Sequence, residues 1–71
     1  MNANGEFTRE KILEVISDYS FTNGFPPTVR EIGDLVGIRS TSTVHKHLGK
    51  LKSQGKIEWN PTKPRTIRRS I

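Results

Sequence analysis

Hydroxyl, imidazole and ammonium side chains gather in the middle of the chain, where their spacing suits recognition chemistry. Val44, Leu48 and Leu51 recur at the spacing of one helix face. They predict a helix over residues 41–53, with Ser40 or Thr41 as its N-cap. The opposite face carries no carboxylate, and its groups suit the base edges and phosphates of a duplex. This outward face consists of Ser42, Thr43, His45, Lys46, Gly49, Lys50 and Ser53.

Catalytic and metal chemistry have little support in the composition. The chain has 71 residues, no cysteine and two histidines, so we expect a single domain, 1–71, with a small core. His45 and His47 are two residues apart and face different sides of a helix, and no acid is placed to orient either as a base. Two histidines alone make a poor metal site. We therefore expect no enzyme activity and no cofactor, with His47 at the boundary of the core.

Charge is divided unevenly along the chain. Residues 1–38 carry three basic and six acidic side chains, whereas residues 39–71 carry nine basic side chains and a single acid, Glu58. The net charge is +5 and the pI is about 10.1. This division indicates a polyanion-binding surface in the second half of the chain. The alternative is a solvated basic surface without a partner.

Two helices are expected before the polar stretch. Thr8 is the expected N-cap of a helix over residues 8–22, with Phe7 and Ile12 as a hydrophobic staple. Residues 1–6 are expected to be disordered. Asn23-Gly24 should end this helix, because glycine adopts the left-handed conformation readily. Its expected core side consists of Ile12, Leu13, Val15, Ile16 and Tyr19.

A second helix is predicted over residues 28–36, opened by a Thr28–Glu31 capping box. Gly33 in mid-helix costs about 1 kcal/mol relative to alanine, so we expect the following helix to approach it closely. Gly37 should end the helix, which completes a helix-turn-helix pattern with residues 41–53. A plain helical hairpin is the alternative. The expected buried face consists of Val29, Ile32, Leu35 and Val36, with Ile38 filling the corner.

The periodicity changes to two after Gly55, which predicts a β-hairpin wing over residues 56–69. Ile57 and Trp59 share one face of its first strand, and packing on the helices is favoured over an exposed stacking role for Trp59. A turn at residues 60–64 leads to a second strand over residues 65–69. The fold class is therefore mainly α, a three-helix winged helix-turn-helix with a C-terminal two-stranded β-hairpin wing. Its tip, with Thr62, Lys63 and Arg65, is expected beside the phosphate backbone.

Three motifs in this order resemble the N-terminal DNA-binding domain of LexA repressors. They are the Pro-Pro-Thr-Val-Arg-Glu-Ile-Gly segment, the Ser-Thr-Val-His start of the third helix and the Asn-Pro-Thr-Lys-Pro-Arg wing. The likeness covers residues 7–68. It implies double-stranded DNA as the partner, a palindromic operator bound by a pair of domains, and repression of DNA-damage (SOS) response genes.

The resemblance also implies which residues bind. Base reading falls on Ser42, Thr43, His45 and Lys46. Contacts to the DNA backbone are expected from Thr28, Arg39, Ser40, Thr41, Lys50, Thr62, Lys63 and Arg65. Lys46 stands where similar members often carry a small residue. Arg69 stands where an apolar strand residue is usual, so we expect the second strand to end before it.

Proteins of this family have a C-terminal half that supplies self-cleavage and dimerisation. This half has no counterpart here, since the chain contains no Ala-Gly cleavage dipeptide and no Ser/Lys protease dyad. We therefore expect dimerisation to be weak or absent. The chain reads as an isolated domain or a small phage or mobile-element regulator. A winged-helix module that binds protein or RNA without reading bases is the alternative from another class. The sequence lacks a signal-peptide pattern and any apolar run of about 20 residues, so we expect no membrane partner and a cytoplasmic location, nucleoid-associated or phage-encoded.

Overall fold

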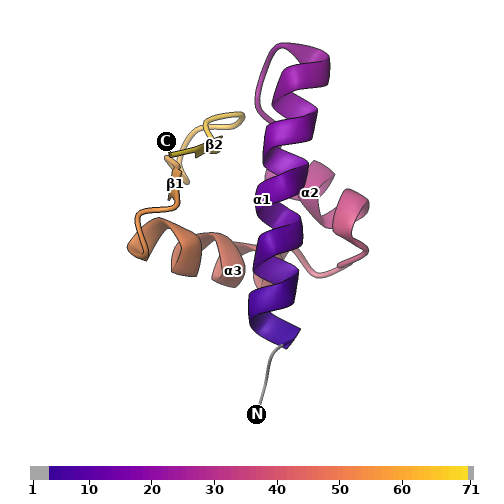
Figure 1. The fold of residues 1–71 in the computed structure, drawn as a ribbon, viewed down its shortest axis with the longest axis vertical. Coiled ribbons are helices and arrows are strands. Elements are labelled where there is room, and N and C mark those ends of the chain that lie inside the picture. The colour runs from indigo at the N-terminus through magenta and orange to yellow at the C-terminus, as the bar shows by residue number, and fades with distance from the viewer. Residues whose placement is uncertain (1–3, 71) are drawn as a thin grey trace.

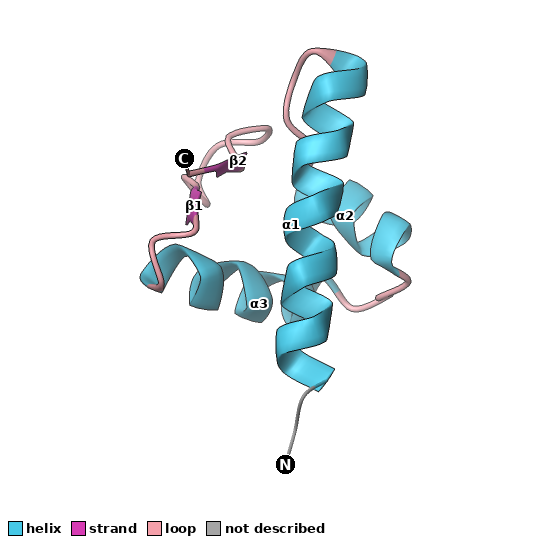
Figure 2. Cartoon of the chain, in the orientation of Figure 1, coloured by secondary structure: helices cyan, strands magenta, loops and turns pink. Residues whose placement is uncertain are grey.

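The computed structural model describes residues 4–70. Three helices are followed by a two-stranded antiparallel sheet, which is the predicted winged helix-turn-helix (Figures 1 and 2). The helices are α1 (Asn4–Asn23), α2 (Val29–Val36) and α3 (Thr41–Ser53), and the strands are β1 (Ile57–Glu58) and β2 (Arg68–Arg69). In Figure 1, α1 runs along the long axis, α3 crosses it and the wing follows the far end of α3. None of the helices in this range is long and apolar enough to span a bilayer.

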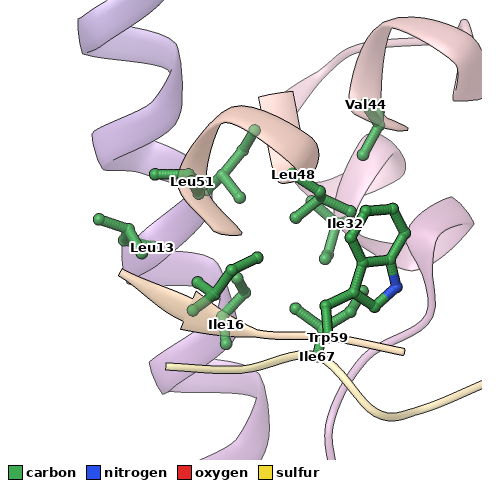
Figure 3. Close-up of a cluster of buried hydrophobic side chains, with 10 residues drawn as sticks. Leu13, Ile16, Ile32, Val44, Leu48, Leu51, Trp59 and Ile67 are labelled. Atoms are coloured by element: carbon green, nitrogen blue, oxygen red, sulfur yellow. The ribbon is translucent and has the colours of Figure 1, made fainter. Parts of the chain in front are cut away.

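The core lies where the three helices and the wing meet (Figure 3). Each helix contributes fully buried aliphatic side chains, and the wing adds three buried residues. Trp59 is 9% exposed, which confirms that the indole packs in the core. The wing is therefore anchored to the helices through its own apolar face. The buried apolar residues are Ile12, Leu13, Ile16, Ile32, Val44, Leu48, Leu51, Ile57, Trp59 and Ile67.

Helix α1 begins earlier than predicted. It starts at Asn4, so Thr8 lies inside the helix, and the prediction of disorder is wrong for residues 4–6. Glu6 in the first turn favours this extension, because a carboxylate stabilises the unpaired N–H groups of a helix start. Phe7 is 62% exposed, so no staple forms with Ile12. Residues 1–3 of the disorder prediction lie outside the described range.

Helix α2 confirms the predicted capping box. The Glu31 N–H donates to Thr28 Oγ1 at 3.1 Å, and the Thr28 N–H donates to Glu31 Oε1 at 2.8 Å. The placement of Leu35 in the buried face is wrong, because its side chain is 57% exposed. Successive helical residues are rotated by about 100°, which puts Leu35 about 60° outside the buried stripe. That stripe consists of Val29, Ile32, Gly33 and Val36.

The turn from α2 to α3 explains the glycine in mid-helix. A Cβ on Gly33 would lie 2.7 Å from the carbonyl oxygen of Ile38 and 3.3 Å from Cγ2 of Val44. The Ile38 N–H also donates to the Gly33 carbonyl at 2.8 Å. Gly37 ends the helix in the left-handed conformation, at φ 80°. The predicted close approach of α3 is thereby confirmed, and it sets the position of the third helix.

The second strand of the wing is shorter than the predicted residues 65–69, because only Arg68–Arg69 (β2) pairs with β1. Arg65 has φ 56°, a left-handed conformation that cannot continue a strand. The expectation that the strand ends before Arg69 is also wrong, since Arg69 pairs with Ile57. Strand pairing uses backbone groups and requires no apolar side chain there. The guanidinium of Arg69 instead reaches α1, where it donates to Ser17 Oγ at 3.3 Å.

Candidate nucleic-acid interface

The outward face of α3 is exposed along its whole length, as predicted. Ser42, Thr43, His45, Lys46 and the residues that continue this face are all exposed, while Val44, Leu48 and Leu51 are buried behind them. Ser40 is the N-cap, and its hydroxyl accepts the Thr43 N–H at 3.3 Å. The hydroxyl of Ser40 is thus engaged in the start of the helix. The first two turns of α3 therefore present exposed polar groups, none of them a carboxylate, in front of a packed apolar face.

The two histidines of α3 have different surroundings. The imidazole of His45 lies against the indole of Trp59, with ring centroids 5.1 Å apart and an angle of 59° between the rings. This contact orients His45 from the wing side. His47 is half-buried, and burial, followed by the charge of Arg9, lowers its pKa below the ordinary 6.5. A neutral histidine at the edge of the core agrees with the boundary position predicted for His47.

A groove of about 390 Å³ lies between the start of α2, the first turns of α3 and the wing loop, which is the loop that joins β1 to β2. It brings together residues that were predicted from separate segments, and it adds Arg30, which the sequence did not indicate. Arg30 is exposed, and no motif marked it within the net-acidic first half of the chain. Polar and basic groups thus converge on one concave surface. The lining includes Thr28, Arg30, Thr41, His45, Thr62, Lys63 and Arg65.

Most basic side chains on the front of α3 and around the groove have no acidic partner in the part of the chain that the structure describes. Within residues 4–70, one ion pair forms within 4.0 Å, and it joins Arg65 to Glu31. Arg39, Lys46, Lys50 and Lys63 are exposed and make no such pair. Unpaired ammonium and guanidinium groups can replace the counterions of a phosphate backbone. The described range also holds no cluster of three histidine, aspartate or glutamate side chains suited to a metal ion.

The wing loop is held by its own side chains. Asn60 Oδ1 accepts the Thr62 N–H at 3.1 Å and the Thr62 hydroxyl at 2.6 Å. The Lys63 N–H donates to the Asn60 carbonyl at 3.0 Å, which closes a turn. The Thr66 hydroxyl accepts the Asn60 N–H at 3.0 Å and donates to the Asn60 carbonyl at 3.0 Å. These bonds replace the ladder of a longer hairpin and leave Lys63 exposed at the tip.

Arg65 is placed differently from Lys63, although the sequence assigned both to the DNA backbone. Its guanidinium turns toward α1 and α2 and pairs with Glu31, with nitrogen–oxygen distances of 3.0 and 3.1 Å. The Thr28 N–H and, secondly, Arg65 lower the pKa of Glu31 from 4.5 to about 2. The wing and the start of α2 therefore share one carboxylate. Nothing in the sequence pattern indicated this pair.

The depressed pKa of Glu31 predicts an acid-sensitive contribution to stability. A carboxylate with a folded-state pKa below its unfolded value stabilises the fold above about pH 4.5, and that contribution is lost as the pH falls toward 2. We expect the urea midpoint of the wild type to fall more steeply between pH 5 and pH 2.5 than that of Glu31→Gln. The two curves should converge at low pH. Parallel curves across this range would contradict the predicted role.

Comparison with known proteins places this fold in a family. The family model for the LexA DNA binding domain matches residues 8–66 of this chain. The LexA repressor of Geobacillus thermodenitrificans (strain NG80-2) is 54% identical over 59 residues, which cover 83% of this chain and 28% of that protein. The LexA repressor of Ligilactobacillus salivarius (strain UCC118) is 53% identical over 62 residues, covering 87% of this chain and 30% of that protein.

A third relative, the LexA repressor of Staphylococcus carnosus (strain TM300), is 52% identical over 59 residues. The chain spans less than a third of the length of these relatives. The matched segment contains α2, α3 and the wing loop, which together form the groove described above. The chain belongs to the LexA DNA binding domain family.

Proposed function

We propose that this chain binds double-stranded DNA in a sequence-specific manner, with α3 in the major groove and the wing loop on the phosphate backbone. The observation that carries the proposal is the exposed front of α3, which is free of carboxylates and flanked by cations that have no acidic partner among residues 4–70. The major groove admits an α-helix, and its base edges present donors and acceptors that differ between base pairs. Ser42, Thr43, His45 and Lys46 are proposed as the base readers.

Phosphate contacts are proposed for the groups around these readers. Arg39 lies just before α3, Thr41 and Lys50 lie within α3, and Thr62 and Lys63 belong to the wing loop. Thr28 lies at the start of α2, where its hydroxyl caps the helix and its side chain lines the groove. Contacts of this kind fix the register of a protein on the duplex and carry no sequence information. Arg30 is added to this set because it lines the same groove.

The regulatory role follows from the relatives. Each is a LexA repressor by name, and we infer that this chain acts as a DNA-binding part of a transcriptional repressor. A palindromic operator, bound by a pair of copies, and control of SOS genes complete the proposal, with the prokaryotic cytoplasm as its place of action. Selection of bound duplexes from a random pool would reveal the half-site and its spacing. Recovery of unrelated sequences only would argue against base reading.

Variants of the two proposed contact classes should behave differently. Ser42→Ala or His45→Ala is expected to cost about 1–3 kcal/mol on the selected duplex and little on random DNA. Lys63→Ala should weaken binding to both duplexes alike and reduce the salt slope, d log K/d log[salt], by about 0.9 in magnitude. Fluorescence anisotropy between 50 and 300 mM salt measures both effects. Equal losses on both duplexes for every variant would refute the assignment of the base readers.

A further inference from the structure

The guanidinium of Arg65 makes contacts to three separate segments. Nη1 and Nη2 form a fork with the two carboxylate oxygens of Glu31 at 3.0 and 3.1 Å. Nη1 also donates to the Pro26 carbonyl at 3.1 Å and to the Tyr19 hydroxyl at 3.4 Å. The guanidinium lies over the Phe25 ring, with its carbon 4.8 Å from the ring centroid. The planar, five-donor shape of arginine suits this set, and a lysine ammonium does not reproduce it.

These contacts join the wing to parts of the chain that are remote in sequence. Tyr19 belongs to α1, Pro26 to the connection before α2, and Glu31 to the first turn of α2. Glu31 Oε1 also accepts the Thr28 N–H at 2.8 Å, so the same oxygen caps α2 and holds the wing. In Figure 1, the loop between β1 and β2 extends toward α1. The loop is therefore tied at its tip as well as at its strands.

The backbone at Arg65 supports the same interpretation. Its φ of 56° lies in the left-handed region, which is unfavourable for a residue with a Cβ. Such conformations persist where surrounding contacts over-determine them. The fork to Glu31, the carbonyl of Pro26 and the ring of Phe25 are the contacts that hold Arg65 in this conformation. Glycine would adopt this backbone conformation without strain, but it would lack every one of these contacts.

We propose that Arg65 is a positioning residue that latches the wing loop to α1 and α2, and thereby sets where Lys63 meets the DNA backbone. This inference rests on the function proposed above. Arg65 is paired with Glu31, whereas Lys63 has no acidic partner within the described residues. A cation already neutralised by a carboxylate contributes little to counterion release, so Arg65 acts through Lys63 and makes no phosphate contact of its own.

The latch can be tested without DNA. In Arg65→Met and Glu31→Gln, the backbone order parameters of the non-proline residues among 60–66, measured by ¹⁵N relaxation, should fall from about 0.85 toward 0.6 or below. Lys63→Met removes one charge from the same loop without touching the latch, so its order parameters should match the wild type. Far-UV circular dichroism establishes that each variant is folded, and Arg65→Lys replaces Arg65→Met if that variant is unfolded. An unchanged loop in the latch variants would overturn the proposal.

The affinities of these variants for the selected duplex then distinguish a latch from a phosphate contact. If Arg65 contacted phosphate, Glu31→Gln would free its charge and tighten binding; the latch predicts binding about 3–10-fold weaker. Arg65→Lys would rescue a phosphate contact and should fail to rescue a latch. Lys63→Met should reduce the salt slope by about 0.9 in magnitude, and because Arg65 acts through Lys63, adding Arg65→Met to Lys63→Met should reduce it no further; an independent phosphate contact by Arg65 would bring the reduction in the double variant to about 1.8.

The two proposals fail in different ways. Tighter binding by Glu31→Gln, wild-type binding by Arg65→Lys, or a slope reduced by about 1.8 in the variant that combines Arg65→Met with Lys63→Met would overturn the latch alone. A wild-type protein that binds no selected duplex, or that shows a flat salt response, would refute the proposed function. In that case the order parameters of the wing loop still decide whether Arg65 holds it.

Discussion

Gly33→Ala is expected to lower the free energy of unfolding by about 1–3 kcal/mol, which is a large fraction of the stability of so small a domain. The added Cβ would lie 2.7 Å from the carbonyl oxygen of Ile38, which is a backbone atom that cannot rotate away. Relief requires α2 and α3 to separate at the turn, where the Ile38 N–H donates to the Gly33 carbonyl. The clash therefore costs more than the roughly 1 kcal/mol by which alanine stabilises a helix interior relative to glycine.

Gly49→Ala provides the matched control, because it makes the same change in mid-helix in α3. A Cβ at Gly49 would meet no atom within 4 Å, so only the helix propensity changes. We expect this variant to be more stable than the wild type by about 0.5–1 kcal/mol. Urea unfolding followed by circular dichroism measures both variants. Stabilisation of both would show that α3 can move away from α2, contrary to the close packing at the turn.

The elements that the sequence predicted well are those with local signals. The Thr28–Glu31 capping box and Gly37 bound α2, and the predicted residues 41–53 coincide with α3. Both faces of α3 followed from its helical period, and the buried Ile57 and Trp59 followed from the alternation of β1. In each case, the residues that determine the structure lie within one turn or one strand of each other.

The errors arose where distant groups decide the structure. Leu35 fits a helical period but lies outside the stripe that α1 and α3 cover, and only the packed fold shows which apolar residues are covered. Arg65 was predicted to lie on a strand, but it has a left-handed conformation and pairs with Glu31, which is 34 residues away in sequence. Periodicity has no means of detecting such a pair. The contribution of Arg30 to the groove was missed for the same reason.

Lys46→Glu should reduce affinity for the selected duplex by roughly 100-fold at 150 mM salt, equivalent to about 2.7 kcal/mol. Lys46 is exposed in α3 and has no acidic partner within residues 4–70. The substitution removes a proposed base contact and places a carboxylate against the polyanion, where like charges repel. The new carboxylate would stand four residues before Lys50, a spacing that favours a helix by about 0.2–0.5 kcal/mol. Loss of binding should therefore occur without loss of fold.

Lys11→Glu changes the net charge by the same amount from an exposed position on α1, which is outside the proposed contact set. Charges separated by more than about 8 Å are largely screened at physiological salt, so this variant should lose no more than about threefold in affinity. Fluorescence anisotropy against the selected duplex compares the two variants directly. Equal losses would mean that net charge alone drives binding and that α3 reads nothing. A 30-fold or greater difference between them would locate the interaction on the front of α3, where Lys46 stands beside His45.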